Sequence, residues 1–186
     1  MRLPGRRVGF AGVMPFFVLP NNESTMQESP RPNDATPPDC FRQSDVEAMQ
    51  AFENQKLASV HYYLWRASPK SSFLYALELY FENGETLLLS SGEGSEAIRL
   101  ISARSLVETA QKLKEMHGEA LIQRIVANIQ PLWRDVIGAN LEEIRLARHE
   151  NGLYHNDALL LDFGETQILL ELSEKDGLVL GEYDLE

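Results

Sequence analysis

Cysteine is nearly absent from this 186-residue chain, which has Cys40 alone. A single thiol cannot form an intramolecular disulfide, and it cannot supply the several thiolates of a zinc or iron–sulfur site. Cys40 lies beside Asp39 in a proline-rich stretch, with no histidine nearby in the sequence to activate it as a nucleophile. The rest of the sequence shows no nucleophile motif and no assembled catalytic set. We expect no cofactor, no metal and no catalytic residue, and the sequence favours a protein without enzymatic activity.

Basic residues are scarce. The chain has 17 Lys plus Arg against 28 Asp plus Glu, a formal net charge of −11. Nucleic acids and anionic membrane surfaces are bound through lysine- and arginine-rich patches, so neither is an expected partner. We expect a cytoplasmic protein that is a monomer or a weak dimer.

Long uninterrupted apolar runs are also missing. Residues 8–19 follow Arg2, Arg6 and Arg7 and superficially resemble a secretion signal, but glycines and Pro15 interrupt them. They are shorter than the roughly 20 apolar residues that span a bilayer. Five prolines then lie between residues 20 and 38. We expect residues 1–40 to be a disordered extension, or translation to begin at Met26, with the folded domain starting near Phe41.

Residues 41–103 predict a first half-domain of one helix followed by strands. A helix is expected from Ser44 to about Asn54, and apolar and aromatic runs then indicate strands at 57–66, 73–81, 86–91 and 97–101. Asn83 and Gly84 are typical of a type I′ hairpin turn, in which both central residues have positive φ. The alternation of residues 77–81 places Leu77, Leu79 and Phe81 on one face of the sheet.

Residues 104–130 predict a central helical segment. Ser105 is a candidate N-cap, apolar residues recur at helical spacing behind it, and Gly118 is a candidate stop. Residues 121–129 fit a helix or an alternating strand, and we expect a helix. Pro131 then predicts a further short helix, which opens a second half-domain over residues 131–186.

The second half repeats the first at an offset of 82 positions. Six residues recur within residues 60–81: Leu64, Arg66, Ala76, Leu77, Leu79 and Phe81 correspond to Leu146, Arg148, Ala158, Leu159, Leu161 and Phe163. The order of elements agrees as well. The predicted fold is therefore α+β: an antiparallel sheet built from two pseudo-repeated half-domains and packed against the central helices.

Negative charge is concentrated in the second half. Residues 150–186 contain ten acids against Lys175 alone, a net charge of 1 − 10 = −9. Acids at outward positions would steer a basic partner toward this half. The expected partner-binding residues are Asp162, Glu165, Glu171, Glu174, Asp176 and Glu182. This hypothesis describes an interaction protein of the bacterial immunity-protein type that binds a basic protein; the alternative is a solvated face that maintains solubility.

A second hypothesis uses the segment from His149 to Asp157. His149, Glu150, His155 and Asp157 bring two imidazoles and two carboxylates within nine residues. A histidine beside a carboxylate can act as a general base or a metal ligand, although the spacing fits no known metal motif. The alternative function is therefore a small-molecule-binding protein or a hydrolase.

Overall fold

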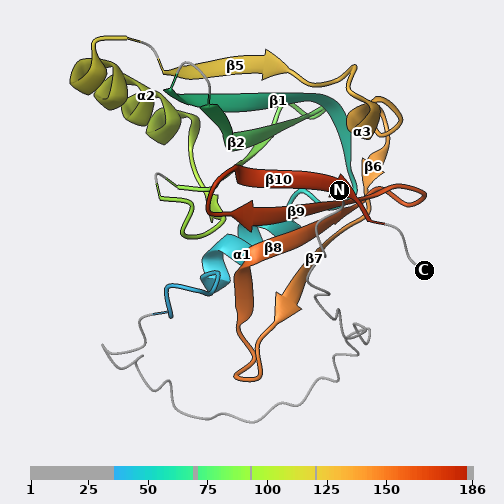
Figure 1. The fold of residues 1–186 in the computed structure, drawn as a ribbon. Helices are drawn as coiled ribbons and strands as arrows, with labels where there is room; N and C mark the ends of the chain where they lie inside the picture. Colours follow the sequence, from blue (N-terminus) through green and yellow to red (C-terminus); the bar gives the residue numbers. More distant parts are fainter. Residues whose placement is uncertain (1–35, 69–70, 93, 120, 184–186) are drawn as a thin grey trace, which may run out of the picture.

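The computed structural model describes residues 36–68, 71–92, 94–119 and 121–183, which form a mixed α+β fold with a large curled sheet (Figure 1). Residues 1–35 of the extension expected over residues 1–40, together with Asp184 and Glu186, lie outside the described residues. Its last residues, 36–40, are described, and Cys40 is buried and forms an isolated β-bridge with His155. The first elements are α1 (Gln43–Gln50), β1 (Gln55–Ser68), β2 (Ser71–Phe81), β3 (Thr86–Ser90), β4 (Arg99–Leu100) and α2 (Ala103–His117). The others are β5 (Ile122–Val126), α3 (Pro131–Arg134), β6 (Asn140–Leu141), β7 (Glu143–Arg148), β8 (Tyr154–Asp162), β9 (Gln167–Ser173) and β10 (Gly177–Glu182).

All strands of the described residues belong to one sheet, with the order β4-β3-β2-β10-β9-β8-β7 and with β1 joining β2 to β5 and β6. The pairings are antiparallel except for the bridge between β10 and β2, where Gly177 lies opposite Leu74. The backbone N–H of Leu74 donates to the carbonyl of Asp176 at 3.0 Å beside this bridge. First-half and second-half strands join at this short contact and at the pairing of β1 with β6.

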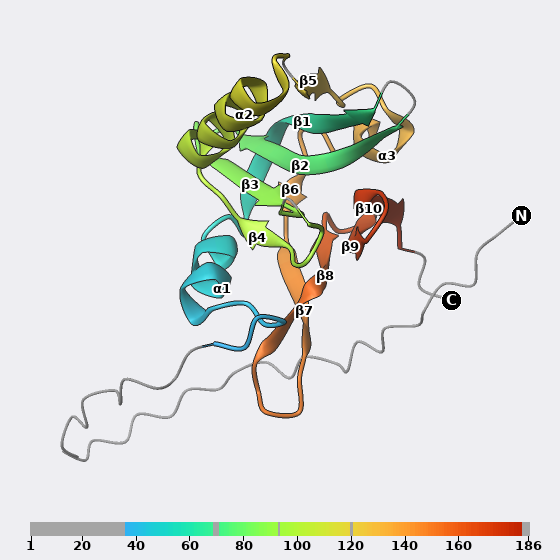
Figure 2. The ribbon, with the colours of Figure 1, turned by 60° about the vertical axis from the view of Figure 1, so that its left-hand side comes forward.

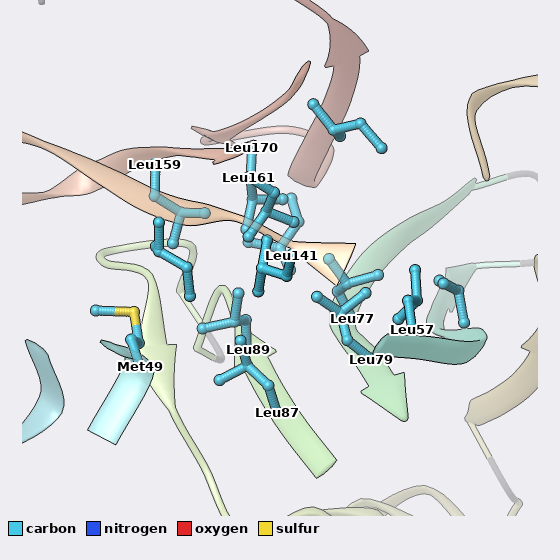
Figure 3. Close-up of a cluster of buried hydrophobic side chains, with 14 of the residues drawn as sticks. Met49, Leu57, Leu77, Leu79, Leu87, Leu89, Leu141, Leu159, Leu161 and Leu170 are labelled. Atoms are coloured by element: carbon cyan, nitrogen blue, oxygen red, sulfur yellow. The ribbon is translucent and has the colours of Figure 1, made fainter. Parts of the chain in front are cut away.

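The main hydrophobic core lies between the two halves of the curled sheet (Figure 3). Leu77 and Leu79 of β2 and Leu159 and Leu161 of β8 are all fully buried in it. Helices α1 and α3 contribute buried side chains as well, Met49 and Trp133 among them. The expected alternation of both central strands is confirmed, because these leucines share the core with Phe81 and Phe163.

Helix α2 covers the other face of the first-half strands rather than the core face that we expected the central helices to cover. Its Leu106 packs in a second cluster with Tyr75, Ala76 and Leu88. Figures 1 and 2 both show α2 beside β1 and β5 and away from β8. The core face of the first half is covered by the second half instead, and the outer face has apolar residues of its own that require a cover.

The predicted helix over residues 121–129 is wrong. Ile122–Val126 is strand β5, which pairs antiparallel with β1 and places Arg124 opposite Tyr63. Both periodicities fit these residues, and the edge of β1 offers hydrogen bonds that only a strand can use. Gly118, with a φ of 78°, ends α2 as predicted, and the chain then turns back along the sheet.

Two local details also differ from the sequence prediction. At the β2–β3 turn, Gly84 has a φ of 88° but Asn83 is not among the described residues with positive φ. Phe81 instead accepts from the N–H of Gly84 at 3.0 Å, as in a type I turn followed by a glycine bulge. The N-cap of α2 is Ser102, whose hydroxyl accepts from the N–H of Ser105 at 3.0 Å.

Within the part of the chain that the structure describes, no helix is both long and apolar enough to cross a membrane.

Candidate binding surfaces

Five of the six predicted partner-binding acids lie on the surface of the second half. Glu165, Glu174, Asp176 and Glu182 are exposed and Glu171 is partly exposed, and none of the five forms an ion pair with a described residue. Glu165 follows β8, whereas Glu174 and Asp176 follow β9. A strand of seven residues spans about 23 Å, so these carboxylates form an extended acidic band rather than a compact cluster.

The expectation that Asp162 points into solvent is wrong, because its exposed fraction is only 4%. Its carboxylate accepts hydrogen bonds from Arg145, from the Gln167 amide at 3.0 Å and from the Gly164 N–H at 2.8 Å. Alternation does place Asp162 on the face opposite the core, but Arg145 of the neighbouring β7 reaches across to it. The hydrogen bond with Glu143, together with the charge of Asp162, raises the pKa of Arg145. Asp162 is thus the buried member of an ion pair whose Arg145 side chain is 34% exposed.

The loop between β7 and β8 brings the two predicted histidines together. The rings of His149 and His155 lie 5.0 Å apart at an angle of 48°. Nδ1 of His149 accepts from the N–H of Asn151 at 3.3 Å, whereas Glu150 and Asp157 are exposed. In the described ranges, no three or more His, Cys, Asp or Glu side chains are placed to hold a metal ion.

A further polar cluster, which the sequence did not predict, is centred on Glu78 of β2. Oε2 of Glu78 accepts from the Tyr63 hydroxyl at 2.9 Å and from Nε and Nη2 of Arg124 at 3.1 and 2.9 Å. Nδ1 of His61 lies 3.3 Å from the same oxygen, is buried and has no hydrogen-bond partner among the described residues. Three strands, β1, β2 and β5, thus converge on one carboxylate oxygen.

The environment of this cluster shifts two pKa values. Burial lowers the pKa of His61, and the Arg124 charge lowers it further against the opposing effect of Glu78. Burial raises the pKa of Tyr63, and its hydrogen bond to Glu78 raises it further. Both shifts favour the neutral forms of His61 and Tyr63 near neutral pH.

A cavity of about 450 Å³ lies between α2 and this outer face of the sheet. We call it the α2 groove; its lining includes Tyr63, Glu78, Leu88, Leu106, Ala110 and Arg124. His61, Tyr63 and Trp65 occupy alternate positions, so the sequence alone indicates that they share one face of a strand. Glu78 and Arg124 lie beside this face only because of the register of β1 with β2 and β5. The prediction of a helix over residues 121–129 did not place Arg124 in the sheet, so the sequence alone did not indicate its contact with Glu78.

No family model, curated protein or solved structure matches this chain, so the functional argument rests on these surfaces and their chemistry.

Proposed function

We propose that this protein is a non-enzymatic interaction protein whose acidic second half binds a basic protein partner. The observation that carries the proposal is the acidic band: Glu165, Glu171, Glu174, Asp176 and Glu182 are all accessible, and none is neutralised by a described Lys, Arg or His. Like charges that remain unpaired on a surface create a potential that attracts an oppositely charged partner over several ångströms.

The extended shape of the band favours a broad basic surface as its complement. Charges spread along both ends of β9 act mainly on the rate of association and on its salt dependence, because each remains partly solvated. Binding should therefore weaken as ionic strength rises. A protein of the bacterial immunity-protein type, whose partner is a basic enzyme or toxin domain, fits this chemistry.

Capture of the partner by two charge-matched variants tests the proposal. The first variant neutralises the band with Glu165→Gln, Glu171→Gln, Glu174→Gln, Asp176→Asn and Glu182→Gln. The second neutralises five exposed acids elsewhere, Glu47→Gln, Glu85→Gln, Glu96→Gln, Glu115→Gln and Glu119→Gln. Each has a formal net charge of −11 + 5 = −6, so only the location of the charge differs.

The immobilised wild-type chain and the second variant should retain the same basic protein from a native lysate at low salt, and the band variant should lose it. Equal capture by both variants would contradict a role for the band. Recovery of no common protein partner at low and moderate salt would overturn the proposed function itself.

The second candidate function, a small-molecule-binding protein or hydrolase that uses residues 149–157, is supported by the contact between His149 and His155. If the pair binds a divalent metal such as Zn²⁺, the ion should raise the Tm of the wild-type chain by mass action. His149→Gln combined with His155→Gln should abolish that rise. An identical Zn²⁺ effect in both proteins, or none in either, would remove this candidate.

We also infer that the halves derive from a duplication. In support, β1–β2–β3 and β7–β8–β9 are both antiparallel meanders. Leu79 and Leu161 are equivalent in the repeat, and both are fully buried. Phe81 and Phe163 are buried as well, and each immediately precedes a hairpin turn.

A further inference from the structure

The α2 groove has the size and walls of a small-ligand site. Its volume of about 450 Å³ falls within the range of about 300–1,000 Å³ that is typical of such sites. Leu88 of β3, Ile122 of β5 and Leu106 and Ala110 of α2 supply apolar walls. Val107 also lines the groove, and 66% of this apolar residue is exposed. An apolar chain lying here would remove that surface from water.

The polar end of the groove offers a hydrogen-bond acceptor. Oε2 of Glu78 receives the bonds from Tyr63 and Arg124, whereas Oε1 accepts none from the residues that the structure describes. The Glu78 side chain is 15% exposed, and Oε1 is not among the buried atoms of the described residues that lack a partner, so it is accessible from the groove. A carboxylate oxygen in such a position is stabilised by a donor from a ligand, and a charged donor makes the stronger bond.

Charge favours a cation over an anion at this position. Nε and Nη2 of Arg124 already donate to Oε2 of Glu78, so these two N–H groups are not open to an anionic head group, whereas Oε1 of Glu78 remains open to a donor. The net charge of −11 also repels anions and attracts cations. His61, the other basic group beside Glu78, is held toward its neutral form by burial and does not compete for the carboxylate.

We infer that the α2 groove binds a small aliphatic primary amine, with the ammonium group donating to Oε1 of Glu78 and the alkyl chain lying between α2 and the outer face of β1, β3 and β5. This site is separate from the acidic band, and neither depends on the other.

Three probes with the same chain and different head groups test the inference. Two-dimensional NMR of the full 15N-labelled chain at pH 7 would follow titrations with octylammonium, octanoate and 1-octanol. Octylammonium should bind at least about tenfold more tightly than octanoate, as expected for a charge-assisted hydrogen bond in a partly buried site. Its shifts should map to α2 and to Tyr63, Leu88 and Ile122. Affinity for octylammonium no greater than for the other probes would overturn the inference.

Glu78→Gln should weaken octylammonium binding at least tenfold and strengthen octanoate binding, because Arg124 is then free of its carboxylate. Glu82→Gln is the matched control: Glu82 is also ion-paired, with Lys56 at 3.0 Å, but lies outside the lining of the groove. It should leave both affinities unchanged, and so should the band variant. Equal losses in Glu78→Gln and Glu82→Gln would show adsorption driven by net charge alone and would contradict the site.

Ala110→Phe provides a second variant that leaves the Glu78 cluster intact. The larger side chain fills the groove and should weaken all three probes by a similar factor of at least about ten. Unchanged octylammonium affinity in this variant would place its binding outside the groove and overturn the inference.

Discussion

At the scale of single residues, Glu78 links three strands through one side chain. Its carboxylate lies opposite His61 in the β1–β2 register and also receives Tyr63 and Arg124. Such a partly buried group is stabilised only while its charge stays matched by donors, because an unpaired carboxylate in an apolar setting is costly. Burial also lowers the pKa of its neighbour His61, so the protonation of His61 is coupled to folding.

His61 should make the protein less stable in mild acid. Its pKa in the folded state is lowered, so between that pKa and about pH 7 the unfolded chain binds more protons than the folded one. The free energy of unfolding should therefore fall as pH drops through this window, by at most about 1.4 kcal/mol per pH unit for one proton. Urea melts from pH 8 to 5 should show a flatter profile for His61→Gln.

His117→Gln is the control for this experiment, because His117 is exposed at the end of α2. That variant should keep the pH profile of the wild-type chain. A His61→Gln profile that remains as steep as the wild-type profile would contradict the lowered pKa.

Asp162 should contribute more to stability than a surface acid. Asp162→Asn removes the carboxylate that accepts from Arg145, and the new amide can direct an N–H group toward the guanidinium. The substitution should lower the free energy of unfolding, measured with urea, by about 2 kcal/mol. Glu143→Gln removes a carboxylate that accepts from the same Arg145 at 2.8 Å. Because the Glu143 side chain is 39% exposed, this substitution should lower the free energy of unfolding by less than about 1 kcal/mol. Equal, small losses would mean that Asp162 is solvated.

At the scale of elements, the sequence predicted a helix or strand correctly where the apolar spacing of the segment fits only one of the two. The alternation of residues 77–81 fits a strand alone, and β2 was predicted nearly to its ends. Ile122, Ile125 and Val126 fit a helix, whereas Leu121, Ile125 and Ala127 alternate as in a strand. The choice depends on the open edge of β1, with which this segment pairs, and the local pattern does not contain that edge. The same dependence on register kept the Glu78 cluster out of reach of sequence reasoning.

Gly177 should be intolerant of any side chain, because it lies at the bridge between β10 and β2. Its φ is +71°, and an added Cβ would lie 2.3 Å from the Leu74 carbonyl oxygen. Gly177→Ala should therefore cost on the order of 3 kcal/mol, through strain and through displacement of β10 from β2.

Gly92→Ala separates these two effects. Gly92 has a similar φ of +73° but no atom within 4 Å of the added Cβ, so it should cost about 1 kcal/mol from strain alone. Equal losses for the two variants in urea melts would show that the β2–β10 contact contributes nothing.

At the scale of the whole molecule, both halves contribute to one core. Phe81 and Phe163 are buried in it, so replacing either by Ala should cost about 3 to 5 kcal/mol. Tyr80→Ala should cost much less, because Tyr80 is 41% exposed on the other face. Urea melts in which Phe163→Ala matches Tyr80→Ala would contradict the position of Phe163 in the core, and with it the repeat.

The sequence pattern does not predict which face of the sheet each helix covers. Leu77 and Leu79 mark one apolar face of the first half, while Tyr75, Ala76 and Leu88 make the opposite face apolar too. A sheet with two such faces requires two covers, and the sequence alone does not say which is the helix and which is the other half. The structure shows the outcome: Leu106 of α2 packs with Tyr75, Ala76 and Leu88, and the second half packs on Leu77 and Leu79.

Native-state hydrogen exchange tests the shared core most directly, because it reports the stability of each half separately. If β2 and β8 bury one core, the most protected amides of both strands should open with the same free energy, within about 1 kcal/mol of the value for global unfolding by urea. The acidic band and the α2 groove would then be carried by one cooperative unit. Exchange of β8 and β9 through an opening several kcal/mol below that of β2 would contradict a single core.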